Sequence, residues 1–103
     1  MITDIPYEWL RRKGTATEFE RESLQQKARA FNLPLEKVVQ KFGTKPFGHM
    51  TDNWRNFIAK IEPEDELWKF ASPVGMFSKK LGCLGFAIVR DGTIRATLIM
   101  MMS

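Results

Sequence analysis

The sequence of 103 residues contains one cysteine, Cys83, and one histidine, His49. A single cysteine excludes a disulfide framework within the chain, and an unpaired thiol fits a reducing compartment, so we expect a cytoplasmic protein. A closed zinc site needs about four Cys, His or carboxylate ligands, and these two residues could form one only with two carboxylates. We therefore expect no metal site and no cofactor.

Long apolar runs are also absent. The longest run of consecutive apolar residues is five, from Leu98 to Met102, whereas a membrane-spanning helix needs about 20. The first residues, Met1-Ile2-Thr3-Asp4, lack the basic start and apolar stretch of a signal peptide. These two absences predict a protein without a membrane partner.

Catalytic chemistry has few candidate residues. Cys83 and His49 could form a nucleophilic pair. However, Cys83 follows a predicted helix C-terminus, where the helix dipole opposes formation of a thiolate. Glycines precede Cys83 directly and follow it two residues later, which favours a small packed side chain. We therefore expect Cys83 to pack in the core, and we expect a protein that is not an enzyme.

Basic residues exceed acidic ones by 16 to 12, which gives a formal charge of +4. Residues 1–50 hold nine of the basic and six of the acidic side chains. The densest basic point, at residues 11–13, lies close to Tyr7 and Trp9. Stacking aromatic residues combined with basic ones are typical of nucleic-acid surfaces. The candidate contacts for nucleic acid or another partner are therefore Tyr7, Arg11, Arg12 and Lys13.

A second interpretation of the same segment is structural. In it, Trp9 and Leu10 anchor the N-terminal segment to the core, and the basic side chains lie in water. The sequence alone does not choose between the two interpretations.

Four segments within the range 1–62 carry helical signals. Pro6 suits the first position of a short helix over 6–13 that ends at Gly14. A capping box at Thr15-Ala16-Thr17-Glu18 predicts a helix to about residue 31, stopped by Asn32. Two more helices are expected, one from Pro34 to Gly43 and one that begins at Thr51 or Asp52.

Apolar residues in these helices recur three or four positions apart, as on the buried face of an amphipathic helix. The predicted core-facing residues are Leu24, Ala28 and Phe31 in the first long helix, Leu35, Val38, Val39 and Phe42 in the next, and Trp54, Phe57, Ile58 and Ile61 in the last.

The pattern changes after Pro63. Residues 66–71 alternate as in a strand, and the β-rich runs 86–90 and 93–101 flank Asp91-Gly92, the strongest short-range hairpin signal. In the last run, Ile94, Ala96, Leu98 and Met100 are expected to line one face. Ser72-Pro73 predicts a short helix that carries Val74, Phe77 and Leu81 and ends at Gly82.

These elements predict an α+β protein with three to four N-terminal and central helices. The helices would pack on a small antiparallel sheet of about three strands that ends in a C-terminal hairpin. A chain of this length holds one core, so we expect one domain over 1–103, helical over 1–62 and mainly strand-forming over 63–103.

Four carboxylates lie close together just before the first predicted strand, at Glu62, Glu64, Asp65 and Glu66. Such a cluster can supply an acid and base pair, bind Mg²⁺ or Ca²⁺, or attract a basic partner. The spacing matches no calcium loop and contains no glycine. We expect a solvated connection between a helix and a strand.

The last strand ends in an uncharged, methionine-rich run. Apolar residues on an edge strand invite pairing with another chain, and methionines adapt to varied surfaces. The candidate residues for a homodimer edge are Leu98, Met100 and Met102. A buried central strand is the competing interpretation.

The C-terminal part of the chain, over the range 64–103, contains the stretch Asp65-Glu66-Leu67-Trp68-Lys69-Phe70-Ala71-Ser72-Pro73, then Gly82 and Gly85, and then Ala87-Ile88-Val89-Arg90-Asp91-Gly92 with Ile94. On these residues it resembles a group of small bacterial proteins without an assigned function. The group often has a second tryptophan after Ser-Pro, where this chain has Met76-Phe77. The resemblance implies no activity.

Two classes of function follow from these residues. The first is a small, non-enzymatic, cytoplasmic interaction module that binds an unidentified protein partner or a second copy of itself. The alternative is a nucleic-acid-binding module that uses the basic N-terminal half.

Overall fold

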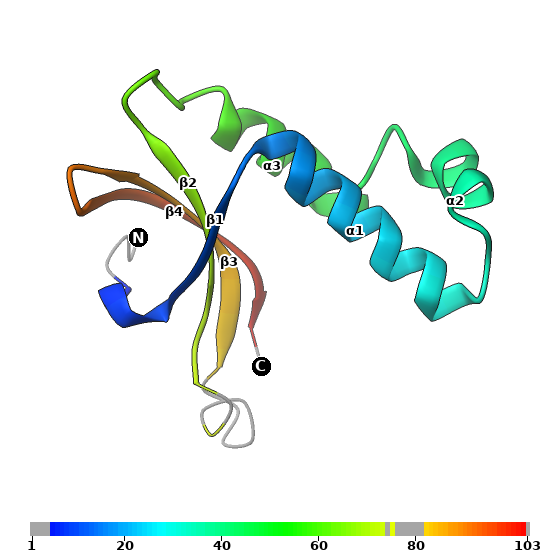
Figure 1. Ribbon diagram of the computed structural model, residues 1–103, viewed down its shortest axis with the longest axis horizontal. Helices are drawn as coiled ribbons and strands as arrows, with labels where there is room; N and C mark the ends of the chain where they lie inside the picture. The colour runs from blue at the N-terminus through cyan, green and yellow to red at the C-terminus, as the bar shows by residue number, and fades with distance from the viewer. Residues whose placement is uncertain (1–4, 74, 76–81, 103) are drawn as a thin grey trace. The chain divides into compact units, whose positions relative to one another are not determined.

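The computed structural model describes residues 5–73, 75 and 82–102, and its fold is of the predicted α+β class (Figure 1). In the described ranges the chain forms three α-helices and one antiparallel sheet of four strands. The elements are β1 (Leu10–Gly14), α1 (Ala16–Phe31), α2 (Leu35–Phe42), α3 (Thr51–Ile58), β2 (Glu66–Ala71), β3 (Cys83–Arg90) and β4 (Thr93–Met102).

The chain divides into two compact units. Residues 15–58 form a helical unit that contains α1, α2 and α3. Residues 1–14 and 59–103 form a sheet unit, in which the strands follow the order β1-β2-β3-β4. The helical unit is therefore an insertion between two strands that are neighbours in the sheet.

Strand β1 corrects the prediction of a helix over residues 6–13. The structure has one 3-10 turn at Tyr7–Trp9, after which Leu10–Gly14 pairs antiparallel with β2. Arginine and lysine favour helices only weakly, and a helix of eight residues is marginal without tertiary contacts. Backbone pairing with β2 and packing of Leu10 on the core outweigh that preference. The sheet consequently has four strands, where about three were predicted.

The β3–β4 hairpin forms as predicted. Its turn residues Asp91 and Gly92 both have positive φ angles, 51° and 75°. This left-handed pair is the signature of a type I′ turn, whose twist matches the strands that it joins. Strand β3 begins at Cys83, three residues before the predicted start.

The sheet unit has a core of its own on one face. Phe70, Cys83, Ala87 and Val89 are buried there. The partly buried residues packed against them are Ile5, Trp9, Leu10, Trp68, Ile94 and Ile99. Trp9 and Leu10 therefore anchor the N-terminal segment to the core, as the structural interpretation of that segment predicted.

The helical unit is organised around Trp54, which is completely buried. Its indole N–H donates a hydrogen bond of 2.8 Å to a carboxylate oxygen of Glu20. The centroid of its ring lies 4.8 Å from the centroid of the Phe47 ring. Phe19 and Phe57 are buried in the same unit. The bond to Glu20 satisfies the polar group of the indole, so the whole side chain can be removed from water.

The ends of α1 match the sequence prediction. The Thr15 hydroxyl accepts a bond from the Glu18 N–H, and the Glu18 carboxylate accepts one from the Thr15 N–H, both at 3.1 Å. Asn32 ends the helix in the left-handed conformation, with φ at 53°. The capping box and stop residue therefore fix this helix locally.

The predicted core faces of α1 and α2 are wrong in part. Val38 is completely buried, but Phe31, Leu35 and Val39 are exposed. Apolar spacing marks a stripe more than 100° wide on a helix, and it does not say how much of that stripe other elements cover. Here only part of each stripe faces the interior of the helical unit.

The helix predicted between Ser72 and Gly82 lies outside the described residues. Ser72 itself is described, and it extends the β2–β3 pairing. Its N–H donates to the Cys83 carbonyl and its hydroxyl accepts from the Cys83 N–H, both at 2.9 Å.

Replacement of Gly85 by alanine tests the packing of β3 against β4. A Cβ atom there would lie 2.0 Å from the Leu98 carbonyl oxygen, a backbone atom that cannot rotate away. We expect Gly85→Ala to lower the free energy of unfolding by about 1–3 kcal/mol, as overpacking does, measured by chemical denaturation. Gly75→Ala is the matched control, because its Cβ would meet nothing within 4 Å. Equal stability of the two variants would contradict this packing.

Candidate functional site

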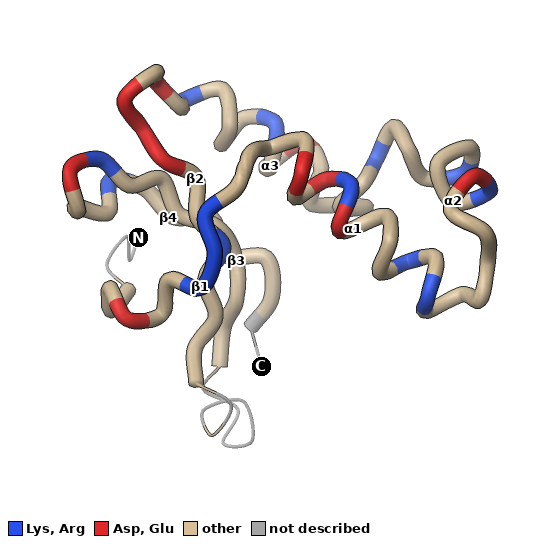
Figure 2. The backbone as a smooth tube through the Cα atoms, in the orientation of Figure 1, with Lys and Arg blue, Asp and Glu red and all other residues tan. Residues whose placement is uncertain are grey.

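The three consecutive basic residues lie on β1, which is an edge strand of the sheet (Figure 2). Arg11, Arg12 and Lys13 are all exposed, and Tyr7 is exposed in the 3-10 turn that precedes them. The structure thus brings the four predicted contact residues onto one short segment. Arg11 and Lys13 also have partners within the sheet unit.

Two of these basic side chains bind other parts of the sheet unit. Arg11 donates through Nε to the Ala71 carbonyl at 3.2 Å. Lys13 forms an ion pair of 3.1 Å with Glu66, whose other oxygen accepts a bond from the Trp68 indole. Charged side chains on an edge strand discourage pairing with a further strand. The basic residues of β1 therefore protect this edge and bind it to β2.

The opposite edge of the described sheet is β4, and its chemistry is different. No charged residue occurs between Ala96 and Met102. Leu98 and Met100 are half-buried, and Met101 is 56% exposed. The side chain of Met102 lies outside the described residues, although its backbone pairs with Cys83. This edge is uncharged and apolar towards its C-terminal end.

Two bulges change the predicted face of β4. The register shifts between Ile88 and Val89 and between Leu84 and Gly85, which leaves Arg95 and Met100 without a direct partner on β3. Ile94 pairs with Val89 and Leu98 with Phe86, three positions apart, so these two side chains point to opposite faces. The prediction that Ile94, Ala96, Leu98 and Met100 share one face is therefore wrong. Alternation alone does not reveal a bulge.

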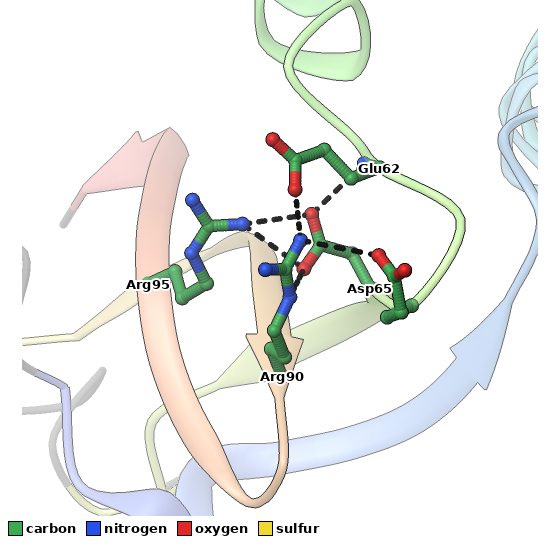
Figure 3. Close-up of polar contacts among 5 residues, drawn as sticks. Glu62, Asp65, Arg90 and Arg95 are labelled. Carbon is green, nitrogen blue, oxygen red and sulfur yellow. Dashed lines mark hydrogen bonds and ion pairs between the residues drawn. The ribbon is translucent and has the colours of Figure 1, made fainter.

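Asp65, one of the four clustered carboxylates, lies just before β2 and is buried, which the sequence did not predict (Figure 3). The Asp65 side chain has no exposed surface. Arg90 donates to it through Nε at 2.8 Å, and Arg95 through Nη1 at 3.0 and 3.1 Å. Asp65 also accepts the Glu62 N–H at 2.9 Å. Two arginines from the β3–β4 hairpin are thus bound to one carboxylate.

The pairing of Asp65 corrects the prediction of a solvated acidic connection. Glu62 and Glu64 are exposed as expected, but both form ion pairs with Arg90. The sequence did contain a signal for this cluster, because pairing the predicted strands as Glu66 with Val89 places residues 65 and 90 opposite each other. Arg95 could not be placed in that way, since it occupies the bulge in β4.

The pKa of Asp65 is held below its ordinary value. The largest cause is the hydrogen bond from the Glu62 backbone, followed by burial, which opposes it, and by the bonds from Arg90 and Arg95. The pKa of Glu66 is lowered by its bonds from Trp68 and Lys13. Both groups are held in the ionised form, which is the wrong state for a general acid near neutral pH.

The remaining candidate for chemistry, Cys83, is buried in the core of the sheet unit. Burial raises the pKa of its thiol, because a thiolate would be poorly solvated there. A nucleophilic cysteine needs the opposite shift. The position therefore agrees with the predicted packing role.

In the part of the chain that the structure describes, no group of three or more His, Cys, Asp or Glu side chains could hold a metal ion. Within the same ranges, none of the helices combines the length and apolar character needed to cross a membrane. Comparisons with protein-family models, curated proteins and solved structures found no match. A proposal of function therefore depends on the geometry of the molecule itself.

Removal of the Asp65 charge should weaken the sheet unit at neutral pH. The pKa of Asp65 is lower in the folded chain than in the unfolded chain, where it is near 3.8. The ionised carboxylate therefore stabilises the fold at pH values above 3.8, and this stabilisation is lost as the pH falls through the pKa of the folded chain. We expect Asp65→Asn to be less stable than wild type at pH 7. We also expect it to take up fewer protons on acid unfolding, by up to about one proton.

The measurement is the free energy of unfolding between pH 2 and 7, from chemical denaturation. Part of the acid dependence should remain, because the pKa of Glu66 is also lowered. Asp52→Asn removes an exposed carboxylate on α3 and is the matched control. If Asp65→Asn had the acid dependence of wild type, the pKa of Asp65 would not be lowered in the folded chain, which would contradict this assignment.

Burial of Cys83 should also protect its thiol from reagents. We expect an aromatic disulfide reagent to react with the native chain at least about a hundredfold more slowly than with the denatured chain, because access requires local opening. A chain with Cys83→Ala and Met101→Cys carries its one thiol at an exposed position. That control should react rapidly in the native state, and rapid reaction of native wild type would contradict the burial of Cys83.

Proposed function

We propose that the protein is a small, non-enzymatic, cytoplasmic interaction module that binds another protein chain along the outer edge of β4. The observation that carries this proposal is the uncharged, apolar edge of the sheet between Ala96 and Met102. An edge strand presents backbone N–H and C=O groups that a further strand can pair with. Strand addition of this kind is a common mode of protein recognition.

The contrast between the two edges supports the choice of β4. Strand β1 has five residues, three of them basic, and two of these are bound within the sheet unit. Strand β4 has ten residues, and its one charged side chain, Arg95, is bound to Asp65. Like charges would repel an incoming strand at β1, whereas no such barrier exists along the end of β4.

A second copy of the chain is the partner that this edge fits best. Two β4 strands can pair antiparallel about a twofold axis, and their uncharged ends place no like charges opposite each other. The bulges at Arg95 and Met100 leave the regular stretch Ala96–Ile99 between them. Because this stretch is short, the dimer should be weak and dependent on protein concentration.

Light scattering and sedimentation of the full chain at roughly 1–500 μM test the proposal. We expect the mean mass to rise with concentration towards twice the chain mass of 11.9 kDa. Met100→Lys combined with Met101→Lys should keep the chain monomeric, because lysine side chains on an edge strand discourage pairing with a further strand.

The control is Tyr7→Lys, which introduces one lysine at a side chain that is 54% exposed, close to the 56% of Met101. This variant should associate as wild type does. A wild-type chain that remains monomeric up to the highest concentration would refute the homodimer. An associated chain with unaltered mass in the methionine variant would refute the β4 interface.

A further inference from the structure

Exposed apolar side chains gather at the end of the helical unit where α1 meets α2. Phe31 is 59% exposed, Leu33 38%, Leu35 39% and Val39 49%. We name these four residues the α1–α2 surface. Isolated apolar residues are ordinary on a protein surface, but a contiguous group is typical of an interaction site.

The α1–α2 surface has a defined shape. The Phe31 ring stacks on the Phe42 ring with centroids 5.9 Å apart and an interplanar angle of 15°. A shallow, open hollow on α2 is lined by Leu35, Val39, Glu36 and Gln40. Asn32 turns the chain between the two helices with its left-handed backbone, which places Phe31 and Leu33 on either side of this turn.

Positive charge borders this surface. The Nζ atoms of Lys27 and Lys41 lie 5.6 and 5.7 Å from the centroid of the Phe42 ring. Residues 24–47 contain five basic side chains and one acidic side chain, a net charge of +4 (Figure 2). The remainder of the chain contains eleven of each. Residues 24–47 of the helical unit therefore account for the whole net charge of the protein.

We propose that the α1–α2 surface binds an acidic amphipathic segment of a partner protein. Apolar side chains of that segment would cover Leu35, Val39 and Phe31, and its carboxylates would lie near Lys27 and Lys41. Apolar contact and charge complementarity together recognise such a segment, as in other complexes of amphipathic helices. This site shares no residue with β4, so the proposal does not rest on the proposed dimer.

The side chains favour a polypeptide over a nucleic acid. Three of the four residues in the surface are aliphatic, whereas nucleic-acid surfaces use aromatic rings on which bases stack. They also favour a polypeptide over a lipid surface. Glu36 and Gln40 line the hollow beside Leu35, and burial of these polar groups in acyl chains would leave them without hydrogen-bond partners.

Fluorescence anisotropy with the full chain tests this proposal. The probe is a labelled helical peptide of about four turns, with leucines at i, i+3, i+4 and i+7 and glutamates at the other positions. A second peptide has lysine in place of every glutamate. We expect saturable binding of the acidic peptide, weakened by salt, and at least about tenfold weaker binding of the basic peptide.

Two variants separate the apolar contribution from the charged one. Leu35→Ser with Val39→Ser should weaken binding of the acidic peptide about tenfold or more, because it removes apolar contact area. Lys27→Glu with Lys41→Glu should weaken it similarly and reduce its salt dependence. Circular dichroism checks that each variant is folded.

The control variants lie elsewhere on exposed positions: Tyr7→Ser for the apolar change and Lys60→Glu for the charge change. Both should bind the acidic peptide as wild type does. The proposal is overturned by absence of binding, by equal binding of the two peptides, or by equal loss in the control variants. Tighter binding of phosphatidylserine vesicles or of oligouridine than of the acidic peptide would also overturn it.

Discussion

The rest of the sheet unit depends on the pairing of β3 along both of its sides. This strand is buried over most of its length, and buried N–H and C=O groups need partners. Strand β2 supplies them along one side over six residue pairs, and β4 supplies them along the other through the Asp91-Gly92 turn. With β3 paired on both sides, β1 pairs beside β2, and β1 and β4 are the edges of the described sheet.

The two edges then acquire opposite chemistry from the residues that they carry. Lys13 and Arg11 bind to residues of β2, so the side chains of the charged edge are held against the neighbouring strand. At the other side, the bulge in β4 directs Arg95 to Asp65, and the one formal charge of that strand is neutralised. The ion cluster thus joins the 62–65 connection to the hairpin and leaves β4 apolar. Stability and the proposed recognition depend on the same bulge.

Local signals predicted local structure well. The Thr15–Glu18 capping box, the Asn32 stop and the Asp91-Gly92 turn act within a few residues, so the sequence alone contains what is needed to place them. The sequence predicted a helix over residues 6–13, where the structure has β1, because pairing with the distant strand β2 outweighs local preference. The bulges at Arg95 and Met100 and the burial of Asp65 depend on distant partners in the same way. Apolar spacing identified α2 but overestimated its buried face, which left the α1–α2 surface unforeseen.

The insertion of the helical unit between two neighbouring strands has a kinetic consequence. Strand β1 is synthesised first, yet its partner β2 emerges only after residues 15–58 have left the ribosome. Contacts within the helical unit and within the β3–β4 hairpin span fewer residues than the β1–β2 ladder, which closes a longer loop and is expected to form more slowly. Strand β1 therefore stays unpaired during synthesis until β2 has emerged. The basic side chains of β1 would then keep a nascent strand in solution until its partner arrives.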